Sequence, residues 1–148
     1  MKLLKLMVLF LFSSSAMAAL FESTEGQTCF RQYSEPVQQN DCLSKAKQES
    51  ETHLDALISE TDKRIKANNP GPFNGVENIP ITSGDMYSKR FLMAQKIWKQ
   101  YRKKMCLAVA TELDEDAYDY QSFIDQCEIN LNKRHEEEIH LMGLPAAR

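Results

Sequence analysis

Four cysteines are the residues of this chain whose type and number most directly specify chemistry: Cys29, Cys42, Cys106 and Cys127. No two of them stand in a close C-x-x-C pair, which is the spacing that structural zinc sites use. An even cysteine count is typical of proteins that leave the reducing cytosol and form disulfides. We therefore predict two structural disulfides at these positions, and neither a metal site nor a catalytic thiol.

The stretch from His135 to His140 reads H-E-E-E-I-H and is a second candidate for metal chemistry. It resembles the zinc-protease helix H-E-x-x-H, but its second histidine comes one residue late. Helical residues five apart diverge by about 140°, so the two rings cannot share one metal ion. We expect a solvated charged face here. We also expect a surface or boundary position for the isolated His53.

Motifs for other enzyme classes are missing from the sequence. It contains no G-x-S-x-G, no phosphate-binding glycine loop and no Rossmann fingerprint. The acidic residues 112–116 belong to a polar run that we interpret as a solvated turn. A small helical bundle also offers little concave surface to a substrate. The sequence therefore predicts a protein that is not an enzyme and uses no cofactor or metal.

Length and charge narrow the remaining classes. The chain has 148 residues, the length of one domain, with 43% hydrophobic and 26% charged residues, so it can fold. Eighteen Lys and Arg against 21 Asp and Glu give a net charge of -3, which argues against nucleic acid as a partner. Only five glycines and five prolines disfavour a β-sandwich or barrel with many turns.

Residues 1–18 show the three parts of a secretory signal peptide. Lys2 and Lys5 precede the apolar run 6–12, and the small-x-small sequence at 16–18 follows. We predict cleavage after Ala18, one domain at residues 19–148, and a periplasmic or secreted, soluble bacterial protein. The apolar run is too short to anchor the chain in a membrane, and no cysteine follows it directly to carry a lipid.

Apolar residues at three- and four-residue steps predict three helices, over residues 42–67, 85–109 and 117–141. Asn40 or Asp41 can cap the first helix and Asp85 the second, whereas residues 19–39 show little periodicity. The predicted fold class is all-α, an antiparallel three-helix bundle with two disulfides. The stripe of the second helix is the strongest helical signal and places Trp98 in the core. Its members are Tyr87, Phe91, Ala94, Trp98, Tyr101, Met105 and Val109.

The second helix also carries a family resemblance. Residues 94–106 read A-Q-K-I-W-K-Q-Y-R-K-K-M-C and resemble the motif A-Q-x-x-W-x-x-Y-R-x-x-x-C of the lysozyme inhibitor LprI-like family. Residues 127–134 are similar to the family's C-x-x-x-L-T-x-x-R, with Asn132 in place of threonine. Cys29 and Cys42 match its two early cysteines, and Asp62 takes the place of an aspartate in its first helix. The resemblance covers residues 29–141 and implies an exported helical domain connected with lysozyme inhibition.

Packing explains the motif residues Gln95, Trp98, Tyr101, Arg102 and Arg134 without catalysis. We expect Trp98 and Tyr101 to be core anchors. Arg102 and Arg134 should extend along the bundle or pair with acids. The acids that we consider are Glu112, Asp125 and Glu128.

The loop at residues 68–84 is long for a compact bundle and looks like an insertion relative to the family. Its apolar residues are Phe73, Val76, Ile79 and Ile81. They either fold back to cap the end of the bundle or form a surface for a partner, a lysozyme or another exported protein. Ser83, Gly84 and Tyr87 match S-G-x-x-Y, which resembles a short motif of other, β-barrel lysozyme inhibitors. The simpler interpretation is that Gly84 ends the loop.

Two disulfide pairings fit the predicted bundle. An antiparallel hairpin brings Cys42 level with Cys106, and the turn at 114–116 returns Cys127 to the same end, opposite the loop. The interleaved pairing joins Cys42 to Cys106 and Cys29 to Cys127. The sequential pairing joins neighbours in the chain. The entropy model favours the interleaved pairing, because longer closed loops restrict the unfolded chain more.

Overall fold

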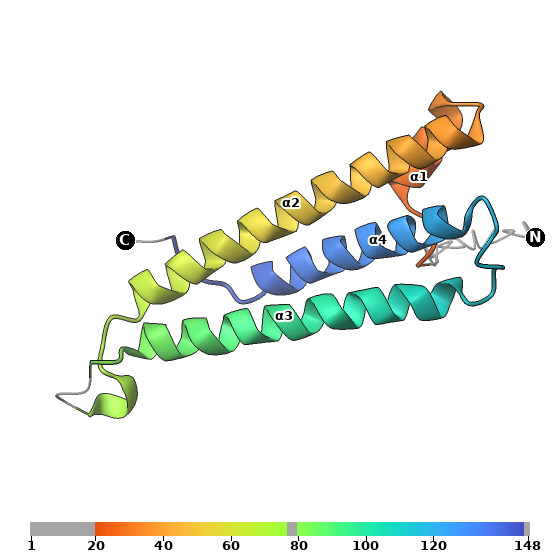
Figure 1. Cartoon of the computed structure of the whole chain (residues 1–148). Helices are drawn as coiled ribbons and strands as arrows, with labels where there is room; N and C mark the ends of the chain where they lie inside the picture. The colour runs from red at the N-terminus through yellow and green to blue at the C-terminus, as the bar shows by residue number, and fades with distance from the viewer. Residues whose placement is uncertain (1–19, 77–79, 147–148) are drawn as a thin grey trace, which may run out of the picture.

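A computed structural model describes residues 20–76 and 80–146 (Figure 1). The predicted signal peptide and Ile79 lie outside these residues. The described chain is helical, without a named strand and with one isolated β-bridge between Pro72 and Thr82, so the all-α class is confirmed. Its elements are α1 (Thr24–Gln32), α2 (Pro36–Asn68), the 3-10 helix η1 (Phe73–Gly75), α3 (Ser83–Ala110) and α4 (Tyr120–His140).

The bundle has four α-helices in its described part, so the prediction of three is incomplete. The three long helices pack against one another, and each runs antiparallel to the next along the chain, as predicted (Figure 1). The additional helix α1 lies in the segment expected to be irregular. Ser23 caps it by accepting a hydrogen bond from the backbone N–H of Gly26 at 2.8 Å. With nine residues, α1 is too short for an extended apolar stripe, and Ser23 was not recognised from the sequence as its N-cap residue.

The long helix α2 begins six residues earlier than predicted. Pro36 is its first residue, because the fixed φ of proline suits the first helical turn, where no backbone N–H is required. Glu35, rather than Asn40 or Asp41, is therefore the N-cap residue. At 33 residues α2 is about 50 Å long, at 1.5 Å per residue. It ends at Asn68, as the following Asn-Pro-Gly sequence predicts.

A capping box begins α3. Thr82 is the N-cap residue, and its hydroxyl accepts a hydrogen bond from the Asp85 backbone N–H at 3.0 Å. The Asp85 carboxylate accepts one from the Thr82 backbone N–H, also at 3.0 Å. The hydrogen bonds that the Thr82 backbone N–H and the Thr82 hydroxyl donate to the Asp85 carboxylate hold the pKa of Asp85 below its ordinary value. Asp85 is thus the third helical residue and not the cap that we predicted.

Helix α4 is the most buried of the helices. It packs against α2 and α3 along its length, and α1 lies against its first half (Figure 1). Many of its buried side chains are polar, among them Asp125, Glu128 and Asn132. Arg134 and Glu138 are exposed. The interior of the bundle is therefore mixed, with buried polar side chains between its apolar clusters.

Three apolar clusters form the core. One lies toward the loop end of the bundle, and two lie toward the α1 end. The first contains Leu54, Ile58, Ile65, Phe91 and Ile139; the second Cys106, Ala110, Ile124, Cys127 and Leu131; the third Cys29, Leu43 and Ile129. Among residues 20–76 and 80–146, no helix has both the length and the apolar character needed to cross a membrane.

The disulfides are sequential, so the interleaved pairing that we favoured is wrong. Cys29 pairs with Cys42, and Cys106 with Cys127, with Cα–Cα distances of 5.8 and 5.5 Å. The reason is α1, which folds back along the start of α2 and presents Cys29 to Cys42. All four cysteines lie at the end of the bundle opposite the loop, as predicted (Figure 1). We call this end the cysteine pole and the other the loop pole.

Candidate functional site

The inward face of α3 carries polar residues where the sequence predicted apolar ones. Gln95 and Arg102 are buried, at 7% and 3% exposure, whereas Tyr101 is 48% exposed. The expectation that Tyr101 is a core anchor is therefore wrong. Trp98 is half-buried at the border between two apolar clusters. Arg134, the last residue of the family motif, is exposed on α4.

Arg102 holds the middle of the bundle together. Its Nη1 donates a hydrogen bond to Asn132 Oδ1 on α4, and its Nη2 donates one to Glu51 Oε1 on α2, both at 2.7 Å. Glu128 lies 3.5 Å from Nη2, one of the acids that we considered as its partner. One guanidinium thus joins all three long helices. This is the planar, multidentate role for which arginine is suited.

The surrounding side chains complete this network. Asn132 is fully buried and donates from Nδ2 to Ser50 Oγ at 3.0 Å. Lys47 Nζ lies 3.4 Å from Glu128 and 3.9 Å from Asp125. Within the described chain, Arg102 Nε and Glu128 Oε2 are buried without a hydrogen-bond partner. Breaking such a buried network is costly, because its remaining charges cannot reach water.

A stacked pair lies next to Arg102. The rings of Trp98 and His135 are 3.8 Å apart and inclined by 8°. His135 Nε2 lies 2.6 Å from Gln95 Oε1, and its Nδ1 lies 2.8 Å from Glu138 Oε2. His135 is buried, so the solvated position that we predicted for it is wrong. His53 is exposed, as expected, with Nδ1 3.0 Å from Glu136.

Spacing could have identified these residues. Glu128, Asn132, His135 and Ile139 recur at steps of four, three and four, which is the period of a buried helical stripe. A search for apolar residues alone passes over such a polar stripe. The family aspartate matched by Asp62 belongs to a similar contact, because Asp62 accepts a hydrogen bond from Ser88 on α3.

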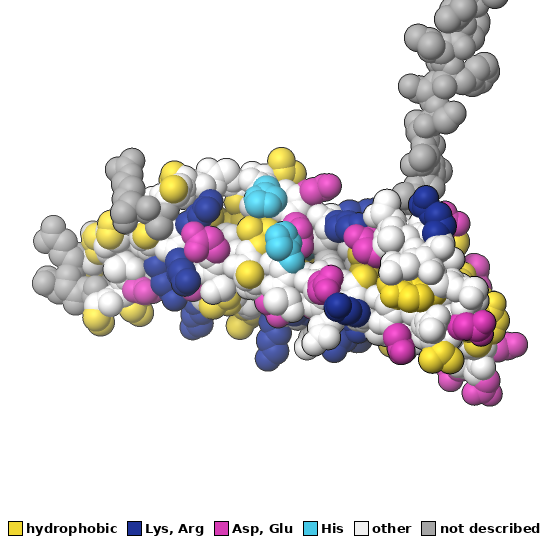
Figure 2. Space-filling view, turned by 90° about the horizontal axis from the view of Figure 1, so that it is seen from above, with side chains coloured by type: hydrophobic (Ala, Val, Ile, Leu, Met, Phe, Trp, Pro, Cys, Tyr) yellow, Lys and Arg dark blue, Asp and Glu magenta, His cyan; other side chains and the backbone are white. Residues whose placement is uncertain are grey.

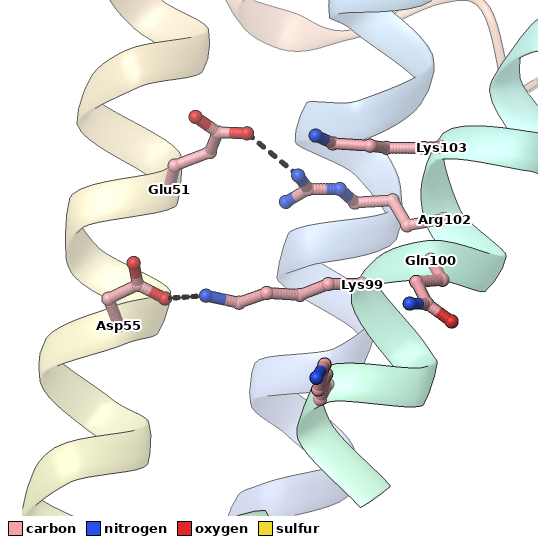
Figure 3. A pocket seen from close by; sticks show the side chains of 7 residues that line it. Glu51, Asp55, Lys99, Gln100, Arg102 and Lys103 are labelled. Carbon is pink, nitrogen blue, oxygen red and sulfur yellow. Dashed lines mark hydrogen bonds and ion pairs between the residues drawn. The ribbon is translucent and has the colours of Figure 1, made fainter. Parts of the chain in front are cut away.

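A groove opens beside Arg102, between α2 and α3 (Figure 3). It has a volume of about 350 Å³. Its acids are already paired across it, Asp55 with Lys99 and Glu51 with Arg102. These contacts fix α2 to α3. Its lining residues are Glu51, Asp55, Lys96, Lys99, Gln100, Arg102 and Lys103.

The loop pole presents apolar side chains to solvent. Val76 and Ile81 are 47% and 42% exposed, so neither folds back onto the bundle. Phe73 is half-buried, with the Arg90 guanidinium 5.9 Å above its ring. Asn74 and Gly75 turn the chain with positive φ values of 56° and 68°. The loop therefore has a defined shape in its described part, with Val76 and Ile81 at its surface.

Backbone hydrogen bonds fix the base of this loop. Phe73 N donates to Ile81 O at 3.0 Å, and Ser83 N donates to Gly71 O at 2.8 Å. A hollow of about 390 Å³ lies beside this base. Its lining comes from the loop and the first turns of α3. These residues are Pro72, Phe73, Asn74, Gly75, Ser83, Met86, Tyr87 and Arg90.

The S-G-x-x-Y residues have different environments. Gly84 is buried where α3 meets the end of α2, and a Cβ there would lie 2.9 Å from the Asn69 carbonyl oxygen. Close packing therefore explains glycine at this position, since no side chain fits. Ser83 is half-buried, and Tyr87 is 38% exposed. Of these three residues, only Tyr87 is exposed.

Charge separates the two poles. The α3–α4 turn, residues 111–119, contains five acids and no base. Figure 2 shows acidic side chains gathered at this end of the molecule. Near the loop pole, the basic residues Lys63, Arg64, Lys66, Lys89 and Arg90 outnumber the acids.

At the cysteine pole Lys133 binds Glu25 at 2.7 Å. Burial raises the pKa of Glu25, but hydrogen bonds from Lys133 and from the backbone outweigh it, so that pKa is lowered.

The fold and this site define a small, disulfide-linked helical bundle with a polar centre and two chemically different poles. Its described residues hold no cluster of three or more His, Cys, Asp or Glu side chains suited to a metal ion.

The chain belongs to the lysozyme inhibitor LprI family: the family model described as "Lysozyme inhibitor LprI" matches residues 29–139. The match includes both disulfides, α2 and α3. Comparison with curated proteins and with solved structures finds no match to either.

Proposed function

We propose that this protein inhibits a lysozyme by direct protein–protein contact. Membership of the LprI family is the observation that carries the proposal, because that family is one of inhibitors and not of enzymes. The polar network around Arg102 then has a structural task. It holds three helices in one rigid arrangement, so that a surface at the end of the bundle keeps its shape.

Export is part of the same proposal. The predicted signal peptide at residues 1–18 supports it, as do the two disulfides, since such bonds persist in oxidising compartments. A periplasmic or secreted location would bring the protein to the compartment in which lysozymes act. Mass spectrometry of the exported protein tests this step, and an N-terminus at Ala19 is the expected result.

The loop pole is the proposed contact surface. Its exposed Val76, Ile81 and Tyr87 offer apolar area to a partner. A projecting loop with a fixed base suits insertion into the concave surface of an enzyme, because little conformational freedom is lost on binding. Ser83 and Gly84 shape the base of this surface, and Ile79 belongs to the same loop by sequence.

The acidic α3–α4 turn, residues 111–119, has a different role in binding from that of the loop. A basic lysozyme is attracted by acids, but the five acids of residues 111–119 lie at the pole opposite the loop. They therefore raise the rate of encounter at a distance, rather than pair with lysozyme at the loop. Neutralising them should slow association at low salt and leave dissociation from the loop surface unchanged.

A turbidity assay with the exported protein and a lysozyme tests the function. Ile81→Ser together with Tyr87→Ser should weaken inhibition at least about tenfold, since each removes exposed apolar area from the contact. The matched control is Val37→Ser, which changes a 71% exposed apolar residue at the cysteine pole. Equal inhibition by all three proteins would move the contact away from the loop.

An envelope interaction module is the alternative function. It would use the same loop on another exported protein and leave lysozyme active. The observation that favours it is the apolar loop surface itself, which suits a protein partner of any kind. Absence of inhibition by the intact, disulfide-bonded protein against several lysozymes would decide for this alternative.

A further inference from the structure

The outward side of α3 is an apolar surface that the proposed lysozyme contact does not use. Met93, Ile97 and Tyr101 follow one another at four-residue steps and are 59%, 60% and 48% exposed. Leu107 continues the same side at 51% exposure. Residues at this spacing lie on one face of a helix, so these side chains form a continuous strip. We call this strip, with the lysines beside it, the α3 outer face.

Every charge on this face is positive. From Met86 to Ala110, α3 contains seven Lys or Arg residues and no acid. Lys99 and Arg102 turn toward α2, where Asp55 and Glu51 bind them (Figure 3). The remaining bases are exposed beside the apolar strip, and the one acid of α3, Asp85, lies in its first turn. They are Lys89, Arg90, Lys96, Lys103 and Lys104.

This charge pattern selects the occupant of the face. Two copies of α3 facing each other would bring ten exposed bases together against one acid from each helix, Asp85, so symmetric self-association is disfavoured. The occupant must be anionic and must also accept apolar side chains.

We propose that the α3 outer face binds the surface of an anionic phospholipid membrane. The helix would lie flat, with Met93, Ile97 and Tyr101 in the boundary between headgroups and acyl chains. The lysines on either side would reach the phosphate groups through their long stems. From Lys89 to Leu107 the face is about 27 Å long, at 1.5 Å per residue, which is enough for several headgroups.

The residue types favour a membrane over an acidic protein. Protein–protein interfaces are enriched in Arg and depleted in Lys, because arginine makes directed, bidentate contacts. Four of the five exposed bases here are lysines, which act as flexible point charges. Lysines that flank exposed Met, Ile, Leu and Tyr are typical of helices that rest on a membrane surface.

Co-sedimentation with vesicles tests the proposal on the exported protein with both disulfides formed. Vesicles of phosphatidylglycerol and phosphatidylcholine should bind it, pure phosphatidylcholine should not, and high salt should release it. Lys96→Gln with Lys104→Gln should weaken binding about fivefold per lysine. Met93→Ser with Ile97→Ser, which keeps every charge, should weaken it about tenfold or more.

Matched variants elsewhere on the surface make the result specific. Lys45→Gln with Lys63→Gln removes two exposed lysines from α2, and Val37→Ser removes an exposed apolar side chain. Both should bind vesicles like the unchanged protein. Equal binding to neutral vesicles, no binding at all, or unchanged binding by the α3 variants would overturn the proposal. Capture by soluble polyglutamate but not by vesicles would overturn it in favour of an acidic protein. Because the assay contains no lysozyme, its outcome is separate from that of the inhibition assay.

Discussion

The two sides of α3 both depart from the usual amphipathic helix, because polar residues are buried on one side and apolar residues are exposed on the other. The inward side buries Ser88, Gln95 and Arg102, whereas the outward side exposes Met93 and Ile97. Surface helices ordinarily place apolar residues inside and charges outside. Here the inward side is determined by partners on α2 and α4, and Met93 and Ile97 on the outward side are exposed. The comparison shows that the side of a helix that is buried is set by specific polar partners as well as by hydrophobicity.

The largest effect is expected at Arg102. Arg102→Ala should lower the free energy of unfolding by about 3–5 kcal/mol, because it leaves Glu128 and Asn132 buried without this partner. The neighbouring Tyr101→Ala, on the outward side, should cost about 1 kcal/mol or less. Urea denaturation measures both. Equal losses for these adjacent residues would mean that the two sides of α3 do not differ as described.

The second effect concerns the disulfide on the inward side. Replacing Cys106 and Cys127 by serine should cost about 3 kcal/mol, since the bond closes a loop of 21 residues. The midpoint of chemical denaturation measures the loss. Non-reducing peptide mapping is the control for the pairing itself, and a peptide joining Cys42 to Cys106 would contradict the sequential arrangement.

Trp98 lies at the border of the two sides, so an intermediate effect is expected. Trp98→Ala should cost about 2–3 kcal/mol, because it removes a half-buried ring and its stacking on His135. Trp98→Phe should recover part of this loss by retaining an aromatic face. Thermal unfolding of the two variants checks the order, and an Ala variant as stable as the parent would place Trp98 on the outer face.

The smallest effect is pH dependence at the start of α3. The pKa of Asp85 is lowered in the folded protein by hydrogen bonds from Thr82, so its contribution to stability is complete above the ordinary Asp value of 3.8. It is lost as the pH falls below 3.8 through the folded value. The protection of the first turn of α3 against hydrogen exchange, relative to the intrinsic exchange rate at each pH, should therefore fall below pH 4. Asp85→Asn should flatten this dependence, and a parent protein without it would remove the capping box from the explanation.

The sequence predicted the helical class, the three long helices and the position of the loop, because these depend on local apolar periodicity and on turn residues. It also placed all four cysteines at one pole. The prediction of which side of α3 faces the core was wrong, however. The search followed Ala94, Tyr101 and Met105, whereas the buried positions are the next residues, Gln95, Arg102 and Cys106.

The misplaced features depend on partners that are distant in the sequence. Arg102 is buried because Glu51 and Asn132 come from two other helices, and no pattern within α3 contains that information. The disulfide pairing likewise depends on α1, a helix that was not predicted because it is too short for an extended periodic pattern. Of the candidate surfaces, the exposed Val76 and Ile81 were among the residues named from sequence. The α3 outer face was not, because its apolar residues were assigned to the core or omitted.

Both disulfides lie at one pole, so local opening of the structure is slow at that end and fast at the other. At the cysteine pole, covalent bonds join α1 to α2 and α3 to α4, so opening there must act against closed loops. At the loop pole, only the side chains around Ile65, Phe91 and Ile139 and the hydrogen bonds of the loop base resist it. Local opening therefore begins at the loop and travels toward the cysteines, and the lifetime of each backbone hydrogen bond lengthens along the same axis.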